Sequence, residues 1–362
     1  MYIAADMRPW PQQLLRWYAA NRREMPWRGH PDPYAVWISE IMLQQTRVEA
    51  VRPYFSRFLK RFPTIGDRAS APPPDVLKLW EGLGYYSRAR NLQAAARQIV
   101  AGHGGLVPQT ATALATLPGI GPYTAAAIAS ICFGERVPVV DGNVARVFSR
   151  YLGWRDDFRK LPARQKLADW LQPQMAGVKS PGDFNQSMME LGALICLPRT
   201  PACAQCPLAA TCHACQTKTQ ADFPVRPARP AVPTRHASAV AIRRRGRVLL
   251  VQRQEKGLLG GFWELPGGAT ARQPNARAAA AAVRRQTGLT VSDLSDKGEL
   301  THVFSHFRLS LALYTCRRAT GRTRTDSAAR LHWASNADLD RLPVATAHRR
   351  ALRICEGTGG KV

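Results

Sequence analysis

The sequence predicts a mainly α-helical N-terminal domain followed by a smaller α+β domain. Most of residues 10–195 reads as a succession of short helices punctuated by Pro, Gly and Asp. The stretch FPVRPARPAVPT at 223–234 is too rich in proline and arginine for a helix or a sheet interior. Beyond it, ASAVAIRRRGRVLLVQR has the composition of two strands joined by a hairpin. We therefore expect domains at 1–222 and 236–362, joined by an extended linker at 223–235.

The charge of the chain predicts a polyanionic partner, for which DNA is the natural choice. Its 362 residues carry 51 Lys and Arg against 25 Asp and Glu, a formal net charge of +26. The first residues, MYIAADMRPWPQQ, lack the apolar segment of a secretion signal, and no apolar run is long enough to span a bilayer. We expect a cytoplasmic, nucleoid-associated monomer with no membrane partner.

The second of the first two predicted helices carries a carboxylate among apolar residues. An amphipathic helix is expected at Trp10–Asn21, and a second begins after Asp32 and continues through AVWISEIMLQQTRVEAV. Glu40 lies in this second helix between Trp37 and Met42. It either belongs to an exposed stripe or lies in an apolar pocket with the raised pKa that a general acid needs. Gln44, Gln45 and Thr46 are expected to continue the helix as an uncharged patch able to read base edges.

A glycine-rich loop follows a short helix that we expect Asp75 to cap. Leu83 and Tyr85 flank Gly84, and Arg88 follows one turn later. In one interpretation, Leu83 and Tyr85 belong to the core and Arg88 to a solvated face. In the other, Leu83 or Tyr85 is a wedge between bases and the arginine contacts a phosphate.

The stretch LPGIGPYTAAAIASICFGERVPVVDGNVAR at 117–146 predicts two helices joined by a tight hairpin. Gly119 and Gly121 permit the turn, and the next helix starts with few side chains around its N–H groups, as a phosphate site requires. Gly134 and Gly153 are expected to end helices. Asp141 is expected to cap the helix that begins near Gly142.

Four cysteines are spaced C-x6-C-x2-C-x5-C at 196–212, while Cys215 falls outside this pattern. Four thiolates in one short loop suit either Zn²⁺ or a [4Fe–4S] cluster, and spacing alone leaves both open. The set is Cys196, Cys203, Cys206 and Cys212.

Together these motifs resemble the helix-hairpin-helix DNA glycosylase superfamily, and WISEIMLQQT resembles its MutY-type adenine DNA glycosylase branch. The resemblance implies that Glu40 protonates the adenine ring and that Asp141 faces the target sugar, with Tyr123 and Asn143 as hydrogen-bonding partners of Asp141. It further implies DNA or lesion contacts, with Gln45 on the opposite base and Tyr85 or Leu83 as the wedge. The other residues assigned to this group are Arg28, Arg88, Gly119, Gly121 and Gln186.

The same resemblance separates two reaction types and assigns the metal. In the related glycosylase/lyases, a Lys follows Pro-Gly-x-Gly-x and attacks the sugar, whereas this chain has Tyr123 there. A phenol cannot form a Schiff base, so we expect hydrolysis without efficient strand cleavage. The cysteine spacing matches the family's [4Fe–4S] loop, which is the cofactor we expect.

The second domain resembles the Nudix fold, with a strand hairpin turning at Arg245-Gly246 and an Ala-rich helix ending at Thr287-Gly288. A Nudix hydrolase needs carboxylates on that helix to hold Mg²⁺, and Ala282, Arg285 and Gln286 stand there instead. The domain is therefore expected to be non-hydrolytic and to recognise 8-oxoguanine. Phe304, Ser305 and His306 match the recognition loop of the family, with Ser305 expected to hydrogen-bond the oxidised base.

The sequence thus predicts a base-excision repair enzyme whose partner is double-stranded DNA containing adenine opposite 8-oxoguanine or guanine. Two alternatives stay open. One is a glycosylase/lyase for oxidised pyrimidines, and the other is a non-catalytic lesion-binding protein.

Overall fold

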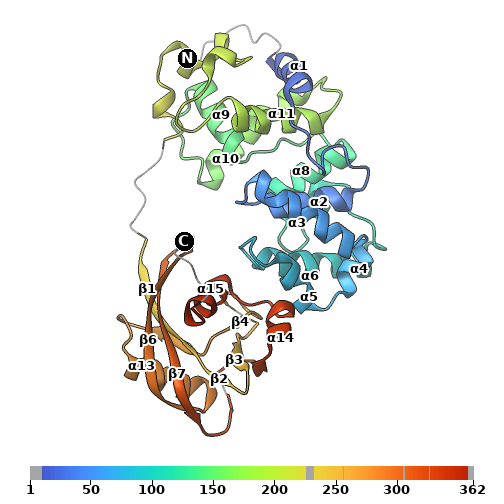
Figure 1. Ribbon diagram of the computed structural model, residues 1–362. Helices are drawn as coiled ribbons and strands as arrows, with labels where there is room; N and C mark the ends of the chain where they lie inside the picture. Colours follow the sequence, from blue (N-terminus) through green and yellow to red (C-terminus); the bar gives the residue numbers. More distant parts are fainter. Residues whose placement is uncertain (1–9, 226–231, 256, 305, 326, 358–362) are drawn as a thin grey trace. The chain divides into compact units, whose positions relative to one another are not determined.

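The protein is described here from a computed structural model, which defines residues 10–225, 232–255, 257–304, 306–325 and 327–357 (Figure 1). The chain forms two compact units. The first contains the residues up to Ser70 and Asn91–Ala228, and the second contains Ala71–Arg90 and the residues from Arg229 onward. Within the described ranges, no helix is both long and apolar enough to cross a lipid bilayer.

The first unit is helical. Its α-helices are α1 (Trp10–Asn21), α2 (Pro33–Leu43), α3 (Val48–Arg61), α4 (Ile65–Ser70), α7 (Ala111–Leu114), α8 (Pro122–Phe133), α9 (Gly142–Leu152), α10 (Leu161–Leu171), α11 (Pro181–Leu194) and α12 (His213–Gln216). Helix α6 (Ser87–Gly102) begins in the second unit and continues into the first. Short 3₁₀ turns are η1 (Gln172–Met175), η2 (Cys203–Gln205), η3 (Ala209–Thr211) and η4 (Gln220–Asp222).

The hairpin before α8 has the expected geometry. Gly119 has a φ of +78°, and a Cβ there would lie 2.6 Å from the Cβ of Asn91, so both the conformation and the space require glycine. Gly121 is the N-cap of α8 without a side-chain hydrogen bond, and Gly134 ends the helix in the left-handed conformation. The predicted bare helix N-terminus is confirmed.

Helix α9 packs closely on α11 and starts at the capping residue Asp141. The carboxylate of Asp141 accepts a hydrogen bond from the Val144 N–H, and Gly153 ends the helix with a φ of +66°. A Cβ at Gly192 of α11 would lie 2.7 Å from the Cβ of Asn143, so the small residue sets the separation of these helices. A buried core that includes Trp10 and Phe184 joins α1, α9, α10 and α11.

Two predicted helix boundaries are wrong. Helix α2 ends at Leu43, and Gln45 has a φ of +56°, so Gln44, Gln45 and Thr46 form a turn before α3. Helix α5 (Pro73–Trp80) starts after Pro72, which puts Asp75 in its first turn and not at the cap. Proline already fixes the φ of a first helical residue, so the helix starts earlier than a capping argument from Asp75 suggests.

The second unit contains two sheets. Its strands are β1 (Thr234–Ala241), β2 (Arg243–Arg244), β3 (Arg247–Gln252), β4 (Trp263–Glu264), β5 (Gly267–Thr270), β6 (Thr290–Val303), β7 (Arg308–Thr320) and β8 (Arg330–Ala334). One sheet has the order β5-β1-β7-β6, with β1 and β7 parallel, and the other has β2-β3-β4 with β8 on β3. Its helices are α5, the start of α6, α13 (Ala276–Thr287), α14 (Asn336–Arg341) and α15 (Thr346–Cys355).

Alternating residues bury both faces of the β5-β1-β7-β6 sheet. Leu311 and Leu313 of β7 join the core that includes Leu352 of α15, whereas Ala312 and Tyr314 join the core of α13. Successive strand residues point to opposite faces, so the sheet lies between these two helices. The predicted hairpin at Arg245-Gly246 and the end of α13 at Gly288 are both confirmed.

Candidate active site and lesion-contacting residues

Glu40 is held inside the first unit by the helix that follows the hairpin. Its side chain is buried together with the apolar residues of α2 that surround it. Tyr123, in the first turn of α8, donates a hydrogen bond from its hydroxyl to Glu40 Oε2 at 3.0 Å. Of the two positions left open for Glu40, the structure therefore has the apolar pocket and not the exposed stripe.

The surroundings of Glu40 favour a protonated carboxyl near neutrality. The pKa of Glu40 is raised to about 7, chiefly by burial and in smaller part by the nearby carboxylate of Asp141. The hydrogen bond from Tyr123 and the charge of Arg28 act in the opposite direction. A carboxyl with a pKa near the working pH can both donate and accept a proton, which is the requirement for a general acid.

Asp141 has a different set of partners, which favour its ionised form. Its Oδ1 accepts from the Val144 N–H at 2.7 Å, and its Oδ2 accepts from Asn143 Nδ2 at 2.9 Å. Burial raises the pKa of Asp141, and these two hydrogen bonds oppose that rise. Asn143 is thus a hydrogen-bonding partner of Asp141 as expected, whereas the Tyr123 hydroxyl is bonded to Glu40 instead.

Asp141 lines a cavity of about 760 Å³, a size within the roughly 300–1,000 Å³ typical of ligand sites. Tyr123, Asp141, Gly121 and Gln45 all line it. Glu40 is hydrogen-bonded to Tyr123, one of the residues that line this cavity. The hairpin, the helix cap and the turn after α2 therefore contribute to a single site.

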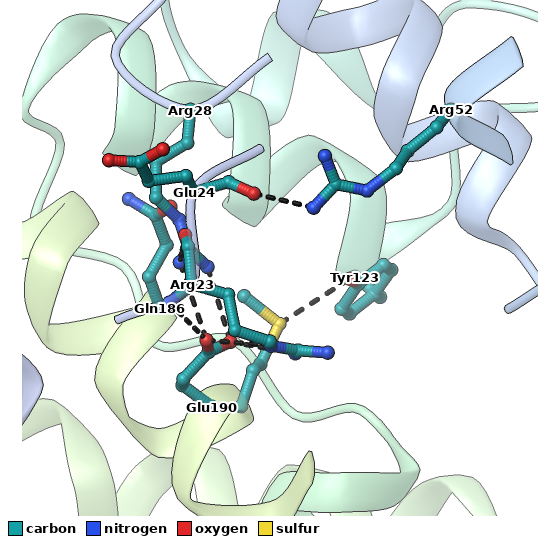
Figure 2. Close-up of polar contacts among 8 residues, drawn as sticks. Arg23, Glu24, Arg28, Arg52, Tyr123, Gln186 and Glu190 are labelled. Carbon is teal, nitrogen blue, oxygen red and sulfur yellow. Dashed lines mark hydrogen bonds and ion pairs between the residues drawn. The ribbon is translucent and has the colours of Figure 1, made fainter. Parts of the chain in front are cut away.

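Arg28 and Gln186 belong to a buried polar network beside this site (Figure 2). Arg28 donates to Gln186 Oε1 at 3.2 Å and to Glu190 Oε2 at 3.2 Å, and Arg23 donates from its backbone and side chain to Glu190. Burial would raise the pKa of Glu190, but the hydrogen bonds from Arg23 and Arg28 outweigh it and lower the pKa to about 2. The carboxylate is therefore ionised and fixes the position of Arg28.

The sequence analysis did not find Arg23 or Glu190. The sequence did contain a signal for Glu190. It is an acid among apolar residues of α11 and lies four residues after Gln186, on the same helix face. A buried acid needs a cationic partner, and α11 has no basic residue. The sequence contained no signal for which arginine supplies the partner.

The loop before α6 exposes one aromatic side chain. Tyr85 is 38% exposed with a φ of +48°, whereas Leu83 is buried, which leaves Tyr85 as the better candidate for a wedge. Arg88 is also buried, and its guanidinium donates to the carbonyls of Leu83 and Gly84. The expected phosphate contact of Arg88 is therefore corrected: Arg88 holds the loop in place.

The four cysteines of the predicted metal loop surround one small cavity, and Cys215 also lines it. Arg150 of α9 donates to the Cys196 sulfur at 3.3 Å and to the Leu197 carbonyl at 2.7 Å. Among the described residues, no three His, Cys, Asp or Glu side chains are placed to hold a single ion. Four cysteine sulfurs around one cavity are a donor set that fits a [4Fe–4S] cluster.

The tip of the β6–β7 hairpin carries the predicted recognition loop. The Phe304 N–H donates to the Phe307 carbonyl at 2.9 Å, and the two rings stack with centroids 4.6 Å apart. His306 is exposed at the turn, and Ser305 lies outside the described residues. The stacked rings fix the two strands on either side of this turn.

Comparison with known proteins identifies the family. Residues 38–173 match the family model of the HhH-GPD superfamily base excision DNA repair protein, and residues 237–353 match that of the NUDIX domain. Adenine DNA glycosylase from Homo sapiens is 35% identical over 414 aligned positions, which cover 98% of this chain and 75% of that protein. The chain belongs to the adenine DNA glycosylase family.

More distant members and a solved structure agree with this membership. Adenine DNA glycosylase from Schizosaccharomyces pombe is 28% identical, over 98% of this chain and 91% of that protein. The structure of a thermostable thymine-DNA glycosylase is 30% identical with a TM-score of 0.53, and it covers 57% of this chain and 95% of that one. The adenine DNA glycosylase family thus accounts for both the helical unit and the Nudix-like domain.

In this member of the adenine DNA glycosylase family, helix α13 lacks the features of a Nudix metal site. Ala282 is buried, Arg285 is exposed, and Gln286 accepts a hydrogen bond from the Gly267 N–H at 2.9 Å. Gln286 therefore has a structural partner at a position where a carboxylate would be needed to bind Mg²⁺.

Proposed function

We propose that the protein is a monofunctional DNA glycosylase that hydrolyses the N-glycosidic bond of adenine opposite 8-oxoguanine, or guanine, in duplex DNA. One observation carries this proposal: the buried Glu40, with a pKa of about 7, is hydrogen-bonded to Tyr123 at the cavity that Asp141 also lines. The adenine DNA glycosylase relatives indicate which base is released, and the two acids supply the chemistry.

The two acids have different roles in the reaction. Glu40 donates its proton to a ring nitrogen of adenine, so that the base leaves as a neutral molecule when the bond from C1′ to the base nitrogen breaks. The sugar then develops the positive charge of an oxocarbenium ion, which the carboxylate of Asp141 stabilises. Water adds to C1′ and loses a proton to Glu40, which restores the acid.

The DNA is held around this cavity by several elements. The bare N-terminus of α8, next to Gly119 and Gly121, binds a backbone phosphate. Adenine rotates into the cavity at a cost of about a few kcal/mol, and Gln45 and Tyr85 contact the base that stays behind. The loop at Phe304, Ser305 and His306 reads 8-oxoguanine.

Strand cleavage is not part of this activity, because Tyr123 stands where a lyase needs an amine. Burial, followed by the charges of Glu40 and Asp141, raises the pKa of Tyr123 well above its usual range. The hydroxyl therefore stays protonated and serves as a donor to Glu40. A glycosylase/lyase for oxidised pyrimidines is disfavoured on this ground.

The four-cysteine loop would hold a [4Fe–4S] cluster through Cys196, Cys203, Cys206 and Cys212. The cluster supplies a fold-stabilising cross-link when bound, and Arg150 holds the loop against α9. Purified protein should show the broad visible absorbance of a [4Fe–4S] cluster, with about four irons per chain. A content of one zinc per chain would contradict the assignment.

One experiment tests substrate, chemistry and strand cleavage together. The protein is incubated with duplexes that carry adenine opposite 8-oxoguanine, guanine or thymine, and free adenine and strand breaks are scored before and after alkali. We expect adenine release opposite 8-oxoguanine and guanine, with breaks only after alkali. Tight mismatch binding without release would favour a lesion-binding protein, and breaks before alkali would favour a lyase.

Single-turnover rates of variants test the two acids. Glu40→Gln and Asp141→Asn should each lower adenine release by at least about 10²-fold, the range reported for general acid catalysis. Asparagine caps a helix about as well as aspartate, so Asp141→Asn should keep the start of α9 intact. A near wild-type rate in either variant would show that the residue does not have the proposed role.

A further inference from the structure

Residues 71–90 lie between helices of the first unit in sequence but belong to the second unit in space. Leu77 of α5 packs on Gly261, where an added Cβ would lie 3.3 Å from the leucine. The rings of Tyr86 and the fully buried Phe262 are 4.2 Å apart between centroids. The segment that carries Tyr85 therefore packs directly on the C-terminal domain.

A charged cluster fixes the start of this loop. Arg349 of α15 donates from Nε and Nη2 to the two carboxylate oxygens of Glu81, at 2.5 and 3.2 Å. Lys78 donates to Glu81 Oε2 at 2.9 Å, and the side chain of Glu81 is only 14% exposed. A paired arginine–carboxylate geometry with little solvent is directional, so it sets the position of Glu81 and of the residues that follow it.

The loop itself has an uncommon conformation. Gly82 and Gly84 have φ values of +97° and +76°, and Tyr85 has a φ of +48° although it is not glycine. The Trp80 indole donates to the Gly84 carbonyl at 3.1 Å, and the Gly82 N–H donates to the Tyr86 hydroxyl. A left-handed tyrosine persists only where its surroundings determine it, and here they include the C-terminal domain.

The far end of the loop is held by the same domain. Arg90 donates from Nη1 to the Gly260 carbonyl at 3.0 Å. Both ends of the exposed Tyr85 thus have contacts with residues after 229, one through Glu81 and the other through Arg90.

We infer that Glu81 and Arg349 are positioning residues, through which the C-terminal domain holds Tyr85 in the shape that inserts beside the base opposite adenine. The inference rests on the proposed function and adds to it a coupling between the Nudix-like domain and the wedge. In this arrangement the domain contributes to mismatch recognition at Tyr85 as well as at its own hairpin loop.

The test compares Glu81→Gln and Arg349→Gln with matched controls in the same unit. Arg243 and Glu356 form another ion pair there, so Arg243→Gln and Glu356→Gln make the same charge changes away from the loop. The readouts are the enzyme concentration for half-maximal adenine release, the single-turnover rate at saturation, and the fluorescence of 2-aminopurine placed next to 8-oxoguanine.

Glu81→Gln and Arg349→Gln, which we call the clamp variants, should raise the half-saturating enzyme concentration about tenfold, a size typical of coupling between contacting residues. They should leave the saturated rate near that of the wild type. They should also lose the 2-aminopurine brightening that accompanies insertion of Tyr85. Tyr85→Ala should behave the same way, and combining it with Glu81→Gln should add little. Arg349→Lys, which keeps the charge but not the paired geometry, should be intermediate.

Two outcomes overturn the inference while adenine release by the wild type upholds the proposed function. In one, the clamp variants match the control variants in all three readouts. In the other, they lower the saturated rate and leave the fluorescence unchanged, which would place their effect on chemistry. Absence of adenine release by the wild type would instead reject the proposed function itself. Thermal melting of each variant verifies that it is folded.

Discussion

At the scale of single residues, Glu40 and Asp141 show how burial and hydrogen bonding divide two roles between like groups. Burial dominates at Glu40 and holds its pKa near 7, because the hydrogen bond from the Tyr123 hydroxyl opposes only part of its effect. Burial also raises the pKa of Asp141, but hydrogen bonds that its carboxylate accepts from Val144 and Asn143 oppose that rise. These surroundings suit Glu40 to the proposed role of proton donor and Asp141 to that of charged stabiliser.

The pH dependence of the reaction follows from Glu40. Its protonated form is the active acid, so the single-turnover rate should be high below pH 7 and fall as the pH rises through the pKa of about 7. The hydrogen bond from Tyr123 lowers that pKa, so Tyr123→Phe should shift the midpoint of the fall to higher pH. A midpoint that stays in place, or moves down, would contradict this role of Tyr123.

Glu40 should also cost the folded protein stability at alkaline pH. Its pKa is about 7 when folded and near 4.5 when unfolded, so the folded state binds the extra proton between these values. The free energy of unfolding therefore falls as the pH rises from 4.5 to 7, by about 3 kcal/mol. Glu40→Gln should remove this loss and be more stable than wild type at pH 8 but not at pH 4.

Denaturant unfolding at the two pH values measures this effect. Glu49→Gln is a suitable control, because the Glu49 side chain is 80% exposed and forms a surface ion pair with Arg52. Equal stability of Glu40→Gln and wild type at pH 8 would show that the carboxyl is solvated in the folded protein.

At the scale of elements, the hairpin before α8 depends on glycine for two separable reasons. Gly119→Ala must place a methyl 2.6 Å from the Cβ of Asn91 as well as adopt a positive φ. Gly134→Ala at the end of α8 meets only the second demand, since nothing lies within 4 Å of its added Cβ.

We expect Gly134→Ala to lower the free energy of unfolding by about 1 kcal/mol, and Gly119→Ala to lower it by about 3 kcal/mol because of the added clash. Gly119→Ala should also weaken binding to undamaged duplex DNA, which Gly134→Ala should leave unchanged. Calorimetry and fluorescence anisotropy measure the two effects. Similar losses in both variants would mean that the Asn91 backbone moves aside at little cost.

The elements that the sequence predicted well are those with local signals. Gly134, Gly153 and Gly288 end helices because only a residue that tolerates positive φ fits there, and Asp141 caps α9 through its own side chain. The end of α2 has no such signal, since Gln44 and Gln45 are compatible with a helix and Gln45 leaves it only in the folded chain.

The candidate site was predictable to the same extent. Glu40 and Asp141 were found from motifs, and the burial of Glu40 was left open because it depends on how α8 packs on α2. The pair of Arg23 with Glu190 joins residues 167 positions apart, and the buried position of Arg88 depends on the carbonyls of a folded loop. Contacts of this kind have no local pattern in a single sequence.

At the scale of the whole molecule, the division into units predicts the effect of truncation. Residues 71–90 pack on residues after 229, so removal of the C-terminal domain should leave the first unit helical and deprive this segment of its partners. Hydrogen exchange should show that backbone amides of residues 76–90 lose protection in a chain that ends near residue 232. The amides of α9, which packs on α11, serve as the internal control, and equal protection in both chains would contradict the grouping.

A relay of hydrogen bonds connects the cysteine loop with Asp141. The Cys196 carbonyl accepts from Arg146 at 2.8 Å, Arg146 donates to Asn143 at 2.9 Å, and Asn143 donates to Asp141. Disruption of the loop would therefore loosen the Asp141 carboxylate, to which we assigned the stabilisation of the sugar. Under the proposed function, the integrity of the cysteine loop would in this way be linked to the position of the carboxylate that stabilises the sugar.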